Sequence, residues 1–418
     1  MSDAGVIIVG AGHGGGTAAA LLRQYGYAAP IRLIGEEPIA PYQRPPLSKA
    51  WLKGEADEDA LTLKPESFYP EAGVELMESA RVEAIDAAAK SVQLVGGERF
   101  AYDQLIIATG AKPRTLPLPG ADLDGVLTLR SVADAEALKS RLGPGKRIAV
   151  VGGGYIGLEV AASARYLGAE AVVIEKEAQI LARVACRVLS DFFTAYHRDR
   201  GVTFELAADV TGFAGVQGRV TGVTLGDGRT IECDVALVGV GAPADDNLAR
   251  QAGLACDGGI LVDIEARTSD PSIFAIGDVT RRPMPQYGGR MFRLESVANA
   301  LEQARHAASA ITGRPPPPPE VTWNWSDQYD LKYQFAGVPF DVDQVLVRGD
   351  PAGAKFAVFH LKDGVIQAVE AVNGPAEFMG GRLLIGQRKP IDPARLADVS
   401  VSMKEVAAPS TMGSAVGA

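Results

Sequence analysis

Two segments of this chain repeat one pattern, in which a short apolar run leads into a glycine-rich loop and then into a stretch rich in Ala and Leu. The first reads VIIVGAGHGGGTAAALLRQYG and the second reads IAVVGGGYIGLEVAASARYLG. The β-branched run predicts a strand and the Ala-rich stretch predicts a helix, so each copy should fold as strand, tight turn and helix. The spacing G-x-G-x-x-G falls on both turns, at Gly10, Gly12 and Gly15 and at Gly152, Gly154 and Gly157.

This spacing has a physical meaning where it joins a strand to a helix. The first glycine makes the turn, the second lets the backbone approach a pyrophosphate, and the third lets the helix pack closely on the strand. The helix N-terminus then offers free N–H groups and a partial positive charge to the phosphates. With 48 Gly in the chain a single match is weak evidence. Two matches that both follow a strand predict two dinucleotide-binding sites.

Each copy also has an acidic residue where a ribose would lie. Such an acid stands at the end of the next strand, roughly 20 residues beyond the glycines, and hydrogen-bonds a ribose hydroxyl. Glu36 in IRLIGEE and Glu175 in AVVIEKE occupy this place. The alternative is a pair of solvated acids at strand ends.

The repetition extends beyond the loops. LVGGERFAYDQLIIATG and LGDGRTIECDVALVGVG align without gaps, each with a Gly-centred hairpin and an apolar strand. A further strand in TSDPSIFAIGDVT has no place in a completed second unit and should return to the first. The chain is therefore predicted to be α/β, with two Rossmann-like dinucleotide-binding domains, the second inserted in the first.

The remainder of the chain predicts a third unit. A helix ends at Gly313, and the run RPPPPPE follows it as a semi-rigid linker. The segments KFAVFHL and VIQAVEAV flank the hairpin signal Asp363-Gly364, which predicts a small C-terminal α+β domain. The predicted boundaries are 1–113 and 242–319 for the first domain, 114–241 for the second, 320–408 for the third, and 409–418 for a disordered tail.

Composition limits the possible functions. The formal net charge of -10 argues against nucleic acid or an anionic membrane as a partner, and no apolar run approaches the roughly 20 residues of a membrane span. A cytoplasmic protein, monomeric or weakly homodimeric, is expected. The three cysteines, Cys186, Cys233 and Cys256, include no C-x-x-C pair, so neither a metal site nor a disulfide framework is predicted.

Six motifs together resemble the FAD- and NAD(P)H-dependent pyridine nucleotide-disulfide oxidoreductase superfamily over nearly the whole chain. They are PYQRPPLSK, LIIATGAKPR, VVGGGYIGLEVAA, FAIGD, LESVANALEQAR and WNWSDQY. Within the superfamily the chain most resembles the putidaredoxin reductase-like ferredoxin reductases of oxygenase systems. Disulfide reductases carry a redox-active cysteine pair beside the flavin, whereas here the residues leading to Lys49 are PPLS. Thiol–disulfide exchange is therefore excluded as the main activity.

The resemblance implies an electron path. NADH would deliver two electrons to FAD, and FAD would pass them singly to a small iron–sulfur ferredoxin, of the two-iron two-sulfur type, that supplies an oxygenase such as a haem monooxygenase. The chain would then be a ferredoxin–NAD(+) reductase. An NADH reductase of rubredoxin, or of monodehydroascorbate or quinones, is one alternative. A redox-dependent interaction protein resembling apoptosis-inducing factor is another.

The resemblance also assigns residues to the cofactors. Those implied for FAD are Gly10, Gly12, Gly14, Gly15, Glu36, Arg44, Lys49, Val82, Thr109, Gly110, Arg130, Asp278, Val297 and Trp325. Those implied for NADH are Gly152, Gly154, Gly157, Glu159 and Glu175, with Gly241 also counted among the cofactor-binding residues. The implied catalytic residues are Lys49, Glu159 and Glu295, and no residue is assigned to a metal.

Several flavin contacts have specific implied roles. Val82 would make an adenine-side backbone contact, Asp278 would bond the ribitol, and Val297 would contact the pyrimidine end of the ring. Arg130 would make a contact where the chain leaves for the second domain. Trp325 would pack beside the isoalloxazine, or else it simply fills a core, as most tryptophans do.

The charged residues have alternatives as well. Lys49 would lie near the reactive edge of the flavin, where a cation stabilises the reduced ring, or it is a surface lysine. Glu159 and Glu295 would orient the nicotinamide carboxamide, or they are ordinary helix-surface acids. Glu175 would accept from a ribose 2′-OH and repel a 2′-phosphate, which favours NADH, although Lys176 beside it weakens the preference.

A docking surface for an acidic ferredoxin requires a local positive face, since the chain is itself acidic. We expect that face to include some of five basic residues near the assigned cofactor residues, the alternative being solvated arginines on loops. These are Arg281, Arg282, Arg290, Arg293 and Lys332.

Overall fold

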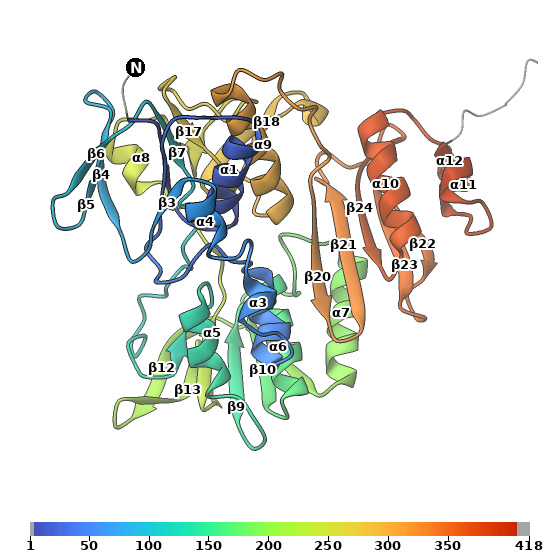
Figure 1. The fold of residues 1–418 in the computed structure, drawn as a ribbon. Helices are drawn as coiled ribbons and strands as arrows, with labels where there is room; N and C mark the ends of the chain where they lie inside the picture. The colour runs from blue at the N-terminus through green and yellow to red at the C-terminus, as the bar shows by residue number, and fades with distance from the viewer. Residues whose placement is uncertain (1–3, 408–418) are drawn as a thin grey trace, which may run out of the picture. The chain divides into compact units, whose positions relative to one another are not determined.

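The computed structural model describes residues 4–407 (Figure 1). The chain divides after Pro319 into two compact units. Within the described residues, no helix combines the length and the apolar character that crossing a membrane requires. The predicted disordered tail at 409–418 lies outside them.

The first sheet holds five parallel strands in the order β17-β7-β1-β2-β3. Val6 and Ile8 of β1 are buried on one face, and Ile7 and Val9 on the other. A parallel strand covered on both faces requires apolar residues at every position, which explains the unbroken run VIIV. The strands are β1 (Val6–Val9), β2 (Ile31–Ile34), β3 (Val74–Met77), β7 (Gln104–Ile107) and β17 (Ile273–Ala275).

Helices cover one face of this sheet and a small sheet covers the other. Helices α1 (His13–Gln24) and α9 (Val297–Ile311) pack on each other and share a core with the strands. Their buried faces are rich in alanine, which lets the two helices approach closely. The opposite face carries β4 (Val82–Asp86), β5 (Ser91–Leu94), β6 (Arg99–Ala101) and α8 (Asn247–Gln251).

The second sheet repeats the arrangement of the first, with the strand order β11-β10-β9-β15-β8, all parallel. Strand β9 takes the central place of β1, and β8 takes the edge place of β17. Its strands are β8 (Val126–Leu127), β9 (Arg147–Val151), β10 (Glu170–Glu175), β11 (Val202–Leu206) and β15 (Val235–Val238). The other elements of this part are α5 (Val132–Lys139), α6 (Tyr155–Tyr166), α7 (Arg187–Asp199), β12 (Val210–Val216), β13 (Arg219–Leu225) and β14 (Thr230–Glu232).

Two antiparallel connections join the two sheets. The chain leaves after β7 and returns after β15, and the two segments hydrogen-bond to each other through their backbones. The Lys112 N–H donates to Pro243 O at 3.1 Å, and the Arg114 N–H donates to Gly241 O at 2.9 Å. The return strand β17 then pairs with β7 of the first sheet.

Short elements fill the remaining loops of the first unit. Between β2 and β3 these are η1 (Pro45–Ser48), α2 (Ala50–Lys53), α3 (Glu58–Leu61) and α4 (Phe68–Glu71). Between α8 and α9 they are β16 (Ile260–Leu261), η2 (Gly277–Val279), β18 (Thr280–Met284), η3 (Pro285–Tyr287) and β19 (Arg290–Phe292), besides β17.

The second unit is an antiparallel sheet in the order β20-β21-β24-β23-β22, with three helices packed on one face. Its strands are β20 (Trp323–Gln328), β21 (Leu331–Gly337), β22 (Gln344–Asp350), β23 (Lys355–Lys362) and β24 (Val365–Val372), and its helices are α10 (Pro375–Gln387), α11 (Pro393–Ala397) and α12 (Met403–Ala407). Asp363 and Gly364 turn the β23–β24 hairpin with φ of +50° and +74°. The predicted fold class, two dinucleotide-type parallel sheets and a C-terminal α+β domain, is confirmed.

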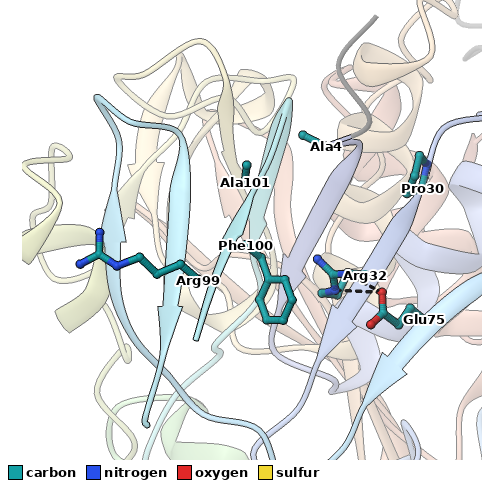
Figure 2. Close-up of a pocket in the computed structure, with 7 residues that line it drawn as sticks. All are labelled: Ala4, Pro30, Arg32, Glu75, Arg99, Phe100 and Ala101. Atoms are coloured by element: carbon teal, nitrogen blue, oxygen red, sulfur yellow. Dashed lines mark hydrogen bonds and ion pairs between the residues drawn. The ribbon is translucent and has the colours of Figure 1, made fainter. Parts of the chain in front are cut away.

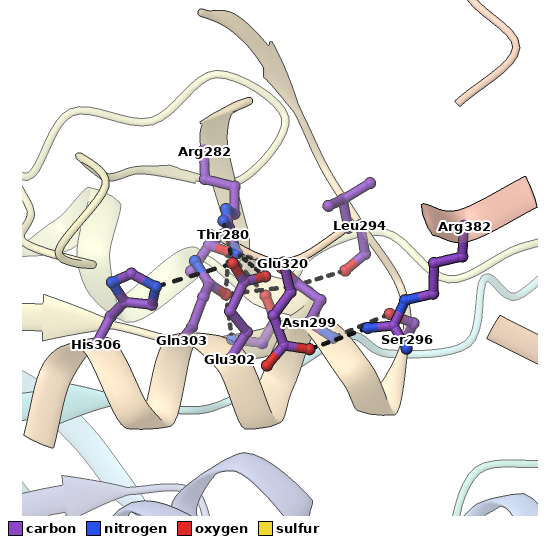
Figure 3. A network of polar contacts seen from close by, with 11 residues as sticks. Thr280, Arg282, Leu294, Ser296, Asn299, Glu302, Gln303, His306, Glu320 and Arg382 are labelled. Atoms are coloured by element: carbon purple, nitrogen blue, oxygen red, sulfur yellow. Dashed lines mark hydrogen bonds and ion pairs between the residues drawn. The ribbon is translucent and has the colours of Figure 1, made fainter. Parts of the chain in front are cut away.

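The docking face predicted from the arginines is wrong at Arg282. Its side chain is only 2% exposed and makes a bidentate ion pair with Glu302 of α9, with N···O distances of 2.8 and 3.1 Å (Figure 3). Arg281, the preceding residue on β18, is partly exposed and pairs with Asp257 instead. Successive side chains of a strand point to opposite faces, so the two arginines cannot serve one surface.

Next to this pair, His306 of α9 is buried as a neutral ring. Its side chain is 2% exposed, and within the described residues neither ring nitrogen has a hydrogen-bond partner. Burial lowers the pKa of His306 below its usual 6.5, and Glu302, 3.8 Å away, opposes this only in part.

We expect this histidine to weaken the fold in acid. Below the unfolded pKa of 6.5 the unfolded chain binds a proton that the folded chain does not, so stability falls as pH falls. For one group the slope is at most about 1.4 kcal/mol per pH unit. Denaturant unfolding at several pH values between 5 and 7.5 should show a smaller slope for His306→Leu than for the wild type. Equal slopes of unfolding free energy against pH in the two proteins would contradict the assignment of His306 as a buried neutral ring.

Candidate functional site

The glycines of the first loop fall into two groups, those that packing or backbone conformation requires and those beside open space. A Cβ on Gly15 would lie 1.9 Å from Gly10 O, and one on Gly10, whose φ is +112°, would lie 2.3 Å from Ala108 O. Gly15 is required by the close approach of α1 to its own loop, and Gly10 by its positive φ and its contact with the backbone that follows β7. A Cβ on Gly12 would meet nothing within 4 Å. Gly14 faces Ile276 and Ala300 at ordinary contact distance, so it serves the α1–α9 packing.

The second loop repeats this geometry. A Cβ on Gly157 would lie 2.2 Å from Gly152 O, and one on Gly152, with φ +110°, would lie 2.5 Å from Gly239 O. A Cβ on Gly154 would again meet nothing within 4 Å. Both loops therefore leave open space beside the middle glycine of the motif, where a pyrophosphate would approach the backbone.

The helices that follow the loops begin without side-chain caps. Neither α1 nor α6 has a capping hydrogen bond or an acidic residue in its first turn, whereas Ser131 caps α5 and Ser296 caps α9. In α1 the buried Nδ1 of His13 also has no partner among the described residues. Uncapped N–H groups and a partial positive charge fit a phosphate ligand at both positions.

The acids after the second strand of each sheet lie beside these loops. Glu175 accepts from the Gly153 N–H at 2.7 Å, so its carboxylate touches the second loop itself. Glu36 is more exposed and lies 3.5 Å from Arg81. The next residue, Glu37, is occupied differently, since it accepts from Arg44 and from the Tyr42 hydroxyl.

Lys49 and Glu159 form a buried pair between segments 110 residues apart in the chain. The Lys49 Nζ lies 2.6 Å from Glu159 Oε2, and the Ser48 hydroxyl donates to the same oxygen at 2.5 Å. The side chains are 15% and 4% exposed. Ser163 of α6 donates to the Ser48 carbonyl at 2.8 Å and fixes the segment before the lysine. The alternatives of a surface lysine and a helix-surface acid at Glu159 are therefore wrong.

A second charged group lies after β17. Arg130 Nη2 is 3.2 Å from the Asp278 carboxylate, and Arg293 donates to the Asp278 carbonyl at 3.1 Å and to Glu295 at 2.7 Å. Partial burial raises the pKa of Glu295, Arg293 opposes the rise, and Asp278 adds to it. Half of the Glu295 side chain remains exposed, so we expect the carboxyl to stay ionised at neutral pH.

The remaining predicted site residues lie in the connections between the two sheets, at the starts of β4 and α9, and on β20. Thr109 donates to the Asp245 carbonyl at 2.8 Å and, with Gly110, belongs to the paired connections, as does Gly241. Val82 begins β4 and Val297 begins α9. Trp325 lies on β20 of the second unit, where its ring packs against Trp323.

Sequence reasoning missed several residues that hold this site together. Ser48, Ser163 and Tyr42 make hydrogen bonds between elements that are distant in sequence, and Gln303 bonds the segment before Asp278. All four stand in segments quoted above, Tyr42 and Ser48 in PYQRPPLSK, Gln303 in LESVANALEQAR and Ser163 in the second glycine segment, but no spacing in those segments indicated their partners.

One pocket, of about 650 Å³, lies at the opposite end of the first sheet (Figure 2). It is lined by Ala4 and Pro30, which precede β1 and β2, and by Arg32, which contacts Glu75 and stacks on Phe100. The glycine loop follows the carboxyl ends of the same strands, where ligands of parallel sheets bind. This pocket is therefore separate from the nucleotide-type loops.

The chain matches two family models. Pyridine nucleotide-disulphide oxidoreductase matches residues 4–304, and Reductase C-terminal matches residues 323–407. The probable ferredoxin reductase CtmF of Castellaniella defragrans is 52% identical over 402 residues, which cover 96% of this chain and 98% of that protein. The ferredoxin–NAD(+) reductase subunit of the benzene 1,2-dioxygenase system of Pseudomonas putida is 39% identical over 401 residues, covering 96% and 97%.

Solved structures agree with these matches. The crystal structure of the covalent putidaredoxin reductase–putidaredoxin complex aligns with a TM-score of 0.95 and 37% sequence identity, covering 97% of this chain and 99% of that one.

The two open glycines offer a matched pair of variants. Gly12 and Gly154 have φ of −86° and −82°, which alanine adopts, and a Cβ at either meets no protein atom. Gly12→Ala should therefore fold normally but bind FAD at least about tenfold more weakly, a loss of about 1.4 kcal/mol. Gly154→Ala should keep FAD and raise the KM for NADH by a similar factor.

Thermal unfolding of the apoproteins, FAD titration and steady-state kinetics measure these effects. If Gly12→Ala instead weakens NADH binding and leaves FAD binding unchanged, the two loops have been assigned the wrong way round.

Proposed function

We propose that this chain, which belongs to the pyridine nucleotide-disulphide oxidoreductase family, is an NADH-dependent FAD flavoprotein that reduces a small ferredoxin of an oxygenase system. The observation that carries the proposal is the pair of open glycine loops together with the buried Lys49–Glu159 pair. The loops would hold two dinucleotides, and the ion pair joins the segment before α2 to α6, the helix that follows the second loop. The family uses FAD and NAD(P)H, and relatives of this chain serve oxygenases.

FAD is assigned to the first loop and NADH to the second. FAD would supply the conversion between a two-electron donor and a one-electron acceptor. On this assignment the FAD-binding domain comprises residues 1–113 and 242–319, the NAD-binding domain residues 114–241, and the C-terminal domain residues 320–408. Trp325 of the last domain is proposed to pack beside the flavin.

Lys49 has a positioning and an electrostatic role. Its ammonium is held by Glu159 at 2.6 Å and by the Pro45 carbonyl at 3.1 Å, so its charge is fixed in one place. A fixed cation beside the flavin would stabilise negative charge that develops when the ring is reduced. Glu159 keeps that cation in place and would orient the nicotinamide, with Glu295.

Electrons are proposed to leave through a protein partner, since two of the three cysteines are poorly suited to thiol–disulfide exchange. None of the three forms a disulfide. Burial raises the pKa of the Cys233 thiol to about 11, and burial also raises that of Cys256, so both remain protonated at neutral pH. A two-iron two-sulfur ferredoxin is the proposed acceptor, since putidaredoxin reductase is seen bound to putidaredoxin.

The proposal is tested with the purified protein. It should bind FAD without a covalent bond and be yellow, and NADH should bleach the flavin absorbance in the absence of air. A two-iron two-sulfur ferredoxin should then be reduced at a rate that depends on the flavoprotein. A protein that stays colourless after incubation with FAD would overturn the proposal.

Cofactor choice should depend on Glu175. Its carboxylate would accept from the ribose 2′-OH and repel a 2′-phosphate, and a hydrogen bond to a charged group contributes about 1.5 to 3 kcal/mol. The wild type should therefore prefer NADH over NADPH by roughly tenfold to a hundredfold in kcat/KM. Glu175→Ser should narrow that ratio.

The matched control is Glu177→Ser, which removes the same charge from an exposed position two residues away. It should leave the ratio nearly unchanged. Equal efficiencies with NADH and NADPH in the wild type would show that Glu175 does not reach the ribose.

A further inference from the structure

Four buried polar side chains connect β18 to α9. They belong to Arg282, Asn299, Glu302 and Gln303, here named the α9 clamp, and none of these residues is more than 2% exposed (Figure 3). We propose that the α9 clamp is a positioning device that fixes Asp278 and the start of α9 relative to each other. The inference rests on the proposed function and on the flavin contacts that the family resemblance implies for Asp278 and Val297.

The clamp has one defined arrangement of donors and acceptors. Arg282 can only donate, so the Asn299 atom 3.2 Å from its Nη1 must be the amide oxygen. The Asn299 amino group then points at two acceptors, the Leu294 carbonyl at 3.0 Å and Gln303 Oε1 at 3.2 Å. The buried guanidinium thus determines the orientation of both amides.

Gln303 connects these hydrogen bonds to the segment that contains Asp278. Its Oε1 accepts from the Gly277 N–H at 2.8 Å. Gly277 has φ +79° and immediately precedes Asp278. The Thr280 hydroxyl lies 2.9 Å from both Gln303 Oε1 and the Gly277 carbonyl, and it donates to one of them at a time. The backbone just before Asp278 is therefore held by this amide oxygen, and the Thr280 side chain after Asp278 can bond the same oxygen.

The same residues define where α9 begins. Ser296 accepts from the Asn299 N–H at 3.1 Å as the N-cap, and the Asn299 side chain bonds Leu294, just before the helix. Val297, for which the family resemblance implies a flavin contact, lies between these bonds. The bidentate pair of Arg282 with Glu302 anchors the helix to β18 one turn further along. Because the clamp excludes water, each of these bonds is stronger than it would be at the surface.

The key variant is Gln303→Leu, which removes the acceptor while nearly preserving volume. Its matched control is Gln328→Leu, the same substitution at a buried glutamine of the second unit. Three quantities are measured for each: the FAD dissociation constant, the midpoint potential of the bound flavin, and the melting temperature of the apoprotein.

We expect Gln303→Leu to raise the FAD dissociation constant by about tenfold. It should also shift the flavin potential, because the positive N-terminal end of α9 would no longer be fixed beside the ring. Gln328→Leu should lower the melting temperature but leave both FAD quantities unchanged. Gln303→Glu keeps an acceptor oxygen in the same place and should restore tight binding.

The proposal would be overturned if Gln303→Leu kept the wild-type flavin potential and FAD affinity. It would also be overturned if Gln328→Leu changed both quantities to the same extent as Gln303→Leu. If Gln303→Leu does not fold, Thr280→Val removes one donor without a change of volume. It should weaken FAD binding by about threefold, and an unchanged affinity and potential would again overturn the proposal. A wild-type protein that binds no FAD would refute the proposed function itself, before any variant is compared.

Discussion

The architecture of both parallel-sheet domains depends on how closely the helix after each glycine loop, α1 or α6, approaches a backbone carbonyl of that loop. A Cβ on Gly15 or Gly157 would lie about 2 Å from the Gly10 or Gly152 oxygen, so any side chain there would displace the helix. With the helix held this close, its uncapped N-terminus faces the open space beside Gly12 or Gly154. The steric requirement and the electrostatic one are thus met by the same short segment.

The two repeated sheets become one working unit through a few long-range polar contacts. Lys49 comes from the segment between β2 and β3 of the first repeat and Glu159 from the helix after the glycine loop of the second, and most of the surface of both side chains is buried. Removing one partner of such a pair leaves an uncompensated charge and costs about 3 to 5 kcal/mol. Ser48 and Ser163 satisfy the remaining groups around the pair, so its geometry is specified as well as its charge.

The sequence was sufficient to predict what local geometry dictates, namely the glycine spacing, the acids after the second strands and the α+β nature of the last unit. It did not reveal partners that meet only in three dimensions. The Lys49–Glu159 pair spans 110 residues. Proximity in sequence to Asp278 and Glu295 makes Arg282 a candidate for a docking face, but strand alternation turns it inward toward Glu302, 20 residues further along the chain.

The burial of Arg282 is not explained by stability alone. Desolvating a guanidinium and a carboxylate costs several kcal/mol per ion, and well-packed apolar residues of similar volume often stabilise a core equally well. An apolar pair, however, cannot orient the hydrogen-bonding side chains around it. Arginine, with donors only, orients Asn299, and Asn299 orients Gln303, whose oxygen holds the Gly277 N–H. A charged group in this core therefore specifies the conformation of a loop whose exact geometry a bound cofactor would require.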